Sequence, residues 1–326
     1  MIAPALTIVI AASHSVEAVN RTLASLGPPR PDVEVIVAAA WDCLSPGLVA
    51  DEGIIFLPAP IGSGVPRLRR LGLDRALGKA VAFTEDSCIA PDGWAAAWLV
   101  AFSDPFLQAA TGPVVPAMGE RAIDWAVFFC EYAPFVLGRT TTISARLAGN
   151  NFAVRRELRT RLDPIEVHEG DVPALLSRPS GCLRRLPSAA IGHARRYRLA
   201  EALGDRLRFG RDYGRRRASA LPRTARLPGL LIGPIVLFVQ VVRLVITVCR
   251  QGRNLVPFVE TLPVTLVLLT AWSVGEWLGW AGAALTRDRR ASASPRRRER
   301  AVRTRARTAF RLSSGRTHYK ADRTPA

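Results

Sequence analysis

Acidic side chains occur in two short segments whose surroundings suggest chemistry. Thr84-Glu85-Asp86-Ser87 directly follows an apolar run at 80–83, and Glu169-Gly170-Asp171 comes later in the chain. Carboxylates at the end of a strand can hold a divalent cation, Mg or Mn, that neutralises a phosphate leaving group. Another carboxylate can take a proton from an attacking hydroxyl. The two segments predict metal-assisted group transfer with a general base, although each has a simpler explanation, as a solvated turn or as acids at a helix start.

Polar residues that could bind a substrate stand between these segments. Asn150 and Asn151 precede Arg155-Arg156, and asparagine offers both a donor and an acceptor to the polar groups of a substrate. Helix capping by asparagine explains the same residues equally well. Arg69 and Arg70 could meet phosphates, or they could lie on an exposed helix face.

The elements that must position these residues follow from the apolar pattern. Short runs rich in Val and Ile, at 6–12, 33–40, 54–57, 80–83 and 110–115, alternate with helical stretches at 16–26, 65–77 and 93–102. This alternation predicts an α/β fold with a mostly parallel sheet and helices on both faces. Ligands of such sheets bind beyond the carboxyl ends of the strands, where Glu85 and Asp86 fall. We expect Asp86 to lie in a surface turn.

The order of these segments resembles family-2 glycosyltransferases with the GT-A fold, over residues 6–217. The resemblance rests on Leu6-Thr7-Ile8-Val9-Ile10, on the acidic turn followed by Pro91-Asp92-Gly93-Trp94, on Asn151-Phe152-Ala153-Val154-Arg155-Arg156, and on the segment from 181 to His193. It implies inverting sugar transfer from a nucleotide-sugar donor.

The resemblance also implies site roles. It makes Asp86 and Glu85 the metal ligands and Asp171 the base, with Glu169 in reserve if the alignment shifts by one residue. Donor or acceptor binding falls to Asn150, Asn151, Arg155, Arg69 and His193. Two segments depart from the family: Ala11-Ala12-Ser13-His14 replaces Pro-Thr-Tyr-Asn, and Ala39-Ala40 replaces a pair of acids. These departures leave the donor's base open.

Charge is concentrated outside the sheet region. The formal net charge is +18, and residues 193–226 carry 11 arginines against three acids. Residues 286–326 carry 14 Lys and Arg against three acids and are expected to be disordered. The five cysteines form no Cys-x-x-Cys pair, which favours reduced thiols over zinc or disulfides. No recognised nucleic-acid motif accompanies the charge, and anionic lipid explains it as well.

Two apolar stretches follow the sheet region, at 228–249 and 255–285, each long enough for a membrane helix. Arg243, Glu276 and the arginines of the connecting loop argue against clean spanning, so a re-entrant hairpin stays open. We therefore expect a GT-A-like domain at 1–226, a membrane-associated helical hairpin at 227–285 and a basic tail at 286–326. The tail and domain should both face the cytoplasm.

The predicted function is transfer of sugar to a lipid-linked or envelope acceptor at the cytoplasmic membrane. The alternative is a catalytically silent relative that acts as a membrane scaffold or regulatory protein, which the alanines at 39 and 40 favour.

Overall fold

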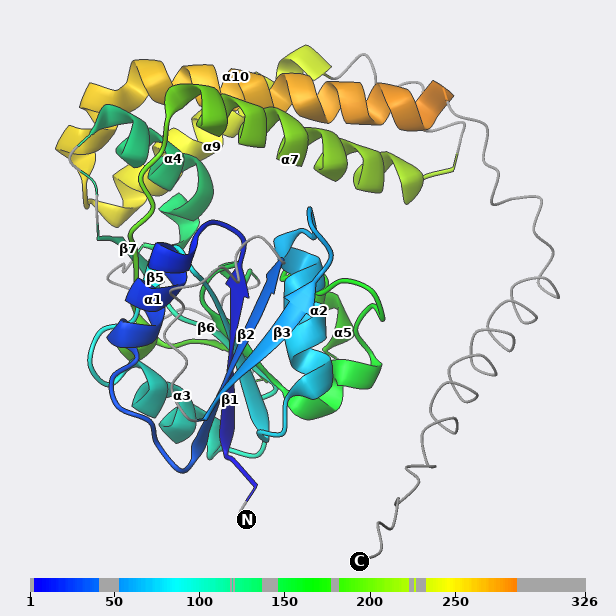
Figure 1. Ribbon diagram of the computed structural model, residues 1–326. Coiled ribbons are helices and arrows are strands. Elements are labelled where there is room, and N and C mark those ends of the chain that lie inside the picture. The colour runs from blue at the N-terminus through cyan, green and yellow to red at the C-terminus, as the bar shows by residue number, and fades with distance from the viewer. Residues whose placement is uncertain are drawn as a thin grey trace, which may run out of the picture.

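The computed structural model describes residues 3–40, 53–117, 119, 121–136, 146–176, 182–222, 226 and 233–285. The expected tail at 286–326 and the start of the expected hairpin at 227–232 lie outside these residues. The described chain is a mixed α/β structure with a layer of long helices on one side (Figure 1). A seven-stranded sheet has the order β3-β2-β1-β4-β8-β6-β9, and a small sheet has the order β5-β10-β7.

The strands are β1 Leu6–Ala12, β2 Val33–Ala40, β3 Ile54–Ala59, β4 Ala80–Glu85, β5 Cys88–Ile89, β6 Ala109–Thr111, β7 Val114–Pro116, β8 Phe152–Arg155, β9 Leu183–Arg185 and β10 Ile191–His193. The α-helices are α1 Val16–Ser25, α2 Val65–Arg75, α3 Trp94–Phe102, α4 Ala122–Tyr132, α5 Val172–Leu175, α7 Leu199–Ser219, α9 Gly233–Gln251 and α10 Leu255–Leu285.

The predicted parallel core is confirmed: β1 pairs in parallel with β2 and β4, and β2 pairs in parallel with β3. Alternate side chains of β1 point to opposite faces, as strand geometry requires. Ile8 belongs to the core beneath α1, α3 and α4, whereas Val9 belongs to the core beneath α2 and α5. Helices therefore cover both faces of the sheet, and the carboxyl ends of β1, β2 and β4 form one edge.

One predicted strand is divided in two. The apolar run at 110–115 forms β6 in the large sheet and β7 in the small one, because Gly112-Pro113 interrupts it. A Cβ built on Gly112 would lie 1.9 Å from the carbonyl oxygen of Ala189. Only glycine allows this approach, which brings the segment before β10 against the end of β6.

The helix layer consists of α7, α9 and α10, with α7 and α10 side by side (Figure 1). Their contact is a glycine seam, defined by Gly210 and Gly214 of α7 and Gly275 and Gly279 of α10. A Cβ on any of the four would lie 1.9–2.3 Å from a backbone carbonyl oxygen of the other helix. Small residues at i and i+4 on both helices let the backbones touch.

The second half of the predicted hairpin is α10, which is the one helix in the described ranges long and apolar enough to cross a membrane. Core helices of soluble proteins can meet the same criterion. In this structure α10 packs on α7 and α4, and its buried side chains share a hydrophobic cluster with those of α4.

Candidate active site

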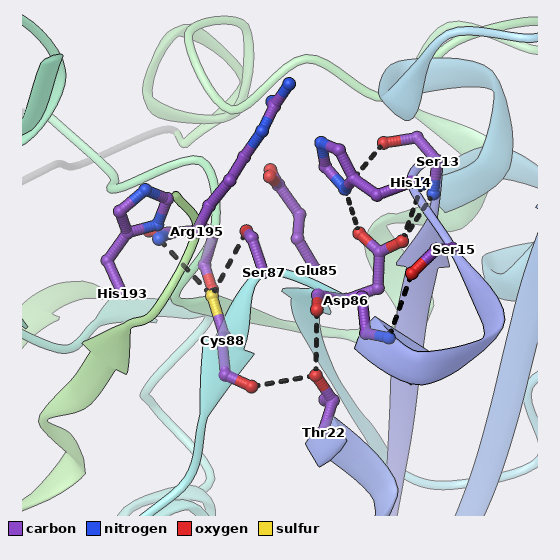
Figure 2. A network of polar contacts seen from close by, with 12 residues as sticks. Ser13, His14, Ser15, Thr22, Glu85, Asp86, Ser87, Cys88, His193 and Arg195 are labelled. Atoms are coloured by element: carbon purple, nitrogen blue, oxygen red, sulfur yellow. Dashed lines mark hydrogen bonds and ion pairs between the residues drawn. The ribbon is translucent and has the colours of Figure 1, made fainter. Parts of the chain in front are cut away.

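Asp86 is buried and forms three hydrogen bonds with the loop after β1. Its Oδ2 accepts from the backbone nitrogens of Ser13 (2.9 Å) and His14 (2.7 Å), and its Oδ1 lies 2.5 Å from His14 Nδ1 (Figure 2). The side chain of Asp86 is fully shielded from solvent. The expectation of a surface turn is therefore wrong. Parallel pairing of β1 with β4 brings the two strand ends together, and Asp86 fixes the loop between β1 and α1.

The turn after β4 is also bonded to α1, through the side chain of Thr22. Thr22 Oγ1 lies within hydrogen-bond distance of the carbonyl oxygens of Asp86 (3.1 Å) and Cys88 (2.8 Å), as Figure 2 shows. Thr22 is buried. The acidic turn is therefore anchored on both sides.

Glu85 and Glu169 meet on a single arginine. Arg69 of α2 is 3% exposed, and its Nη2 lies 3.0 Å from Glu85 Oε1 while its Nη1 lies 2.9 Å from Glu169 Oε2. Its Nη2 also donates to the carbonyl oxygen of Gly149 at 2.8 Å. Arg69 thus joins a neighbour of its own strand–helix unit to Glu169, which is 100 positions further along the chain. We call these three residues the Arg69 cluster: Arg69, Glu85 and Glu169.

The two carboxyls of the Arg69 cluster differ electrostatically. Burial raises the pKa of Glu85 although Arg69 opposes it. Desolvation acts in the same direction on Glu169, but Arg69 and local hydrogen bonds outweigh it and hold the pKa of Glu169 below its ordinary value. Glu169 keeps 37% of its side chain exposed. It is therefore ionised at neutral pH and accessible from solvent.

Asp171 lies apart from this cluster. It is exposed and precedes the short helix α5, where its side chain makes no capping hydrogen bond. Within the described residues it forms no ion pair with Arg69. The structure thus brings the reserve candidate, Glu169, to Glu85 and leaves the first choice, Asp171, at the surface.

Both asparagines are fully buried. Asn151 Nδ2 donates to the carbonyl oxygens of Pro113 and Ala189, each at 2.8 Å, and Trp94 Nε1 donates to its Oδ1 at 3.1 Å. Asn150 Nδ2 lies 3.4 Å from Cys88 Sγ. Asn151 therefore joins the connection between β6 and β7, the segment before β10 and the start of α3, and its amide is already satisfied inside the protein.

Arg155 lies at the other end of the sheet. Because β8 runs antiparallel to β4, Arg155 pairs with Ala80, at the amino end of β4, whereas Glu85 ends that strand. Its guanidinium donates to the carbonyl oxygens of Phe102, Asp104 and Leu107. The structure does not bring Arg155 to the site.

His193 ends β10 near the acidic turn and is 5% exposed. Its Nε2 lies 3.2 Å from Tyr197 Oη, its ring packs on Tyr132, and within the described residues its Nδ1 has no hydrogen-bond partner. Burial lowers the pKa of His193 to about 4. The imidazole is therefore neutral at physiological pH and supplies no positive charge to a phosphate.

The carboxylates predicted to bind a metal do not form a suitable donor set. Asp86 is bonded to the loop after β1, Glu85 is paired with Arg69, and Ser87 occupies the third position of the motif. No group of three His, Cys, Asp or Glu in the described parts of the chain could hold a metal ion. A hard divalent cation needs carboxylate oxygens that are free to coordinate it, and with Asp86 and Glu85 both engaged by protein groups these residues do not offer such a pair.

Two residues beside the acidic turn were missed as site residues. Figure 2 shows His14 on Asp86 and the Arg195 side chain extending past Glu85. Arg195 is 19% exposed and pairs with Glu201 and Asp205 of α7. His14 was detectable, because it follows a strand parallel and adjacent to β4, whereas the position of Arg195 depends on the small sheet.

No protein-family model matches the chain, and no curated protein does. Among solved structures it is similar to the mannosyltransferase PcManGT from Pyrobaculum calidifontis in complex with GDP-Man and Mn2+, with 18% identity over 95% of this chain and 81% of that one and a TM-score of 0.43. It is similar to GalNAc-T7 with UDP, GalNAc and Mn2+ at 16% identity, over 59% of this chain and 43% of that one, with a TM-score of 0.44. It is also similar to glucosyl-3-phosphoglycerate synthase from Mycobacterium tuberculosis in complex with Mn2+, UDP and phosphoglyceric acid. The identity is 15% over 60% of this chain and 72% of that one, and the TM-score is 0.40.

Proposed function

We propose that the chain is an inverting GT-A glycosyltransferase that moves a sugar from a nucleotide-diphosphate donor to a lipid-linked or envelope acceptor. The observation that supports this most is the Arg69 cluster at the carboxyl end of β4, where Arg69 holds Glu85 and Glu169 together. Open parallel sheets bind ligands at this edge.

In this proposal Glu169 is the general base. The acceptor hydroxyl oxygen forms a bond to the anomeric carbon of the donor while the bond from that carbon to the diphosphate oxygen breaks. The hydroxyl proton passes to Glu169, and the electron pair leaves with the nucleoside diphosphate. The lowered pKa keeps Glu169 ionised at neutral pH, and its partial exposure lets an acceptor reach it. The same ion pair with Arg69 weakens its affinity for a proton, so the role rests on its position and exposure rather than on its pKa.

Positive charge for the leaving diphosphate comes from the protein in this proposal. Arg195 extends beside Glu85 (Figure 2). It pairs with Glu201 and Asp205 but keeps 19% of its side chain exposed, and the several N–H groups of an arginine allow it to bind phosphate oxygens as well. Arg69 is not assigned this role, because its guanidinium is buried against Glu85, Glu169 and Gly149.

The helix layer supports a membrane-bound acceptor. It lies on the side toward which the carboxyl ends of β1 and β2 point (Figure 1). Arg216 Nη1 of α7 lies 2.7 Å from the ring nitrogens of His168, the neighbour of Glu169. An acceptor held at this layer would be close to the base. Arginine-rich flanks favour the cytoplasmic side of the membrane.

A silent scaffold is the second candidate, and one observation favours it. Ala39 and Ala40 end β2 at the same sheet edge, where the resembling family carries acids, and both are buried.

Nucleotide binding separates these functions. At 100 times its dissociation constant, a nucleoside diphosphate should stabilise the fold by about 2.7 kcal/mol, so we expect one member of a UDP, GDP, ADP, CDP and dTDP panel to raise Tm. Because the predicted metal ligands are engaged elsewhere, the rise should be equal in EDTA and in Mn2+. A folded protein that shifts with no nucleotide and transfers no sugar would support the scaffold. A rise seen only with Mn2+ would restore the metal site.

A further inference from the structure

The outward face of α10 is mostly apolar. The exposed large hydrophobic residues recur at helical spacing, so they fall on one side of the helix. We call them the α10 stripe: Leu255, Val256, Val259, Leu266, Val267, Val274, Trp277, Leu278 and Leu285. Within this span the exposed Glu260 is the one charged residue on that side.

The inward face of α10 is the more polar one. Its buried residues include Thr261, Thr265, Ser273 and Glu276 along with two glycines of the seam. Glu276 Oε1 lies 3.1 Å from Arg217 Nη1 of α7, and Glu276 Oε2 lies 3.4 Å from Gln240 Nε2 of α9. A helix of a water-soluble surface has the opposite pattern. The reversed pattern indicates that the medium outside α10 is apolar.

The packing of α10 also restricts its orientation. At its start Phe258 contacts Phe129 of α4, in its middle Leu268 packs with Ala126 of α4, and towards its end Gly279 touches α7. The inward face of α10 therefore packs against α4 and α7 from its start to near its end. If α10 crossed a bilayer, it would carry α7, with six arginines, into the hydrocarbon.

The flanking charges suit an anionic surface. α9 has its own exposed apolar residues, including Phe238, Val242 and Ile246, and the exposed Arg243 and Arg250 are its charged residues. Arg253 is exposed in the turn before α10. Basic residues next to an apolar face are typical of helices that lie in the plane of a membrane.

We propose that α9 and α10 lie in the plane of an anionic bilayer, with the α10 stripe in the acyl boundary and the carboxyl edge of the sheet held above the headgroups. This surface specifies the membrane association of the proposed function and does not depend on sugar transfer. The occupant is lipid, since a second copy of this chain would not require the flanking arginines.

Flotation with preformed vesicles tests this surface. Full-length protein should float with vesicles that contain about 30% phosphatidylserine, which gives them a negative surface charge like that of a cytoplasmic leaflet. Val259→Glu/Val267→Glu should weaken binding at least about tenfold, because charges must then enter the acyl boundary. The matched control, Val100→Glu/Phe106→Glu, changes apolar residues outside the helix layer that are even more exposed, and it should bind like the unmodified chain. Equal thermal midpoints would show that both variants fold.

Three results would overturn the proposal. Vesicle binding by the stripe variant at full strength would remove the stripe from the contact, and so would release of the unmodified chain by high salt alone. A lipid-free dimer that the stripe variant abolishes, without vesicle binding, would identify the face as a protein interface.

Cysteine labelling tests the orientation in cells. In a Cys249→Ser background, Arg253→Cys should not react with an impermeant maleimide added on the face opposite the α/β domain. Labelling from that face would mean that the hairpin crosses the membrane, contrary to the in-plane arrangement. Nucleotide binding is independent of both experiments, so their failure would leave the proposed transferase standing.

Discussion

Glu85 and Asp86 are neighbours in sequence but have different partners in the structure. Glu85 joins the Arg69 cluster, while Asp86 bonds the loop that follows β1. The motif predicted that both would serve one metal. Which carboxylate remains accessible depends on Arg69 and His14. The place of His14 near the end of β4 could be predicted from the sequence, but its bond to Asp86 and the two ion pairs of Arg69 could not.

The burial of Asp86 changes the expected effect of its replacement. Asp86→Ala removes the charged acceptor of the backbone nitrogens of Ser13 and His14, and a hydrogen bond to a charged group contributes about 1.5–3 kcal/mol. We expect the free energy of unfolding to fall by about 3 kcal/mol in urea titrations. Asp92→Ala, at an exposed position nearby, should change it by less than about 0.5 kcal/mol. Equal stability of the two variants would contradict the structural role of Asp86.

His193 makes stability depend on pH. Burial lowers its pKa in the folded state to about 4, whereas the unfolded chain should have a pKa near 6.5. Between these values the unfolded state binds more protons, so stability is constant above about pH 6.5 and falls as pH drops toward 4. This residue should account for about 3 kcal/mol of that loss.

His193→Gln removes the titrating group and should flatten this part of the profile. Urea unfolding of both proteins at pH 7 and pH 4.5 measures the difference. If the variant loses as much stability as the unmodified chain over this interval, His193 is not the group responsible.

At the scale of elements, the parallel core β1 to β4 and the helices around it could be predicted, because their apolar runs are long and alternate regularly. The positions of β6 and β8 could not. Gly112-Pro113 looks like part of one strand in the sequence, and nothing in residues 150–156 reveals that β8 runs antiparallel. That direction decides that Arg155 lies at the edge opposite Glu85.

The glycine seam should be the contact in the helix layer most sensitive to added atoms. Gly214→Ala places a Cβ 2.1 Å from the carbonyl oxygen of Glu276, which forces the backbones of α7 and α10 apart. We expect Tm to fall, with a loss of about 3 kcal/mol. Gly204→Ala, in the same helix with nothing within 4 Å, should instead stabilise by about 0.5–1 kcal/mol. Similar effects of the two substitutions would argue against close packing at the seam.

At the scale of the whole molecule, α10 is part of the structure that carries the site. Leu268 packs with Ala126, Tyr197 and Ala202, so α10 covers the outer side of α4 and the start of α7. A chain ended after residue 226 would expose this surface. We expect it to aggregate or to unfold at a lower temperature than the full chain, as differential scanning fluorimetry would show. A monomeric fragment with the Tm of the full chain would mean that the layer contributes little to stability.

The sequence could predict that two apolar helices follow the sheet, because 20-residue apolar stretches are visible without a structure. It could not predict that their polar residues face inward. Glu276 counts against a membrane helix in a linear reading, yet it is buried between Arg217 and Gln240. The candidate site was likewise predictable as an edge of the sheet. The pairing of Glu85 and Glu169 with the same arginine was not, because Glu169 lies 100 residues after Arg69 and only the tertiary structure brings them together.

Sugar transfer by matched carboxylate variants tests the central claim most directly. With the nucleotide identified by the thermal panel and its sugar as donor, Glu169→Gln should lower kcat by about 10²–10⁴-fold while donor affinity persists, because the amide cannot accept the acceptor's proton. Asp171→Asn, two residues away and exposed, should stay within a few-fold of the unmodified enzyme. Loss of kcat in Asp171→Asn with full activity in Glu169→Gln would contradict the assignment of the base to the Arg69 cluster.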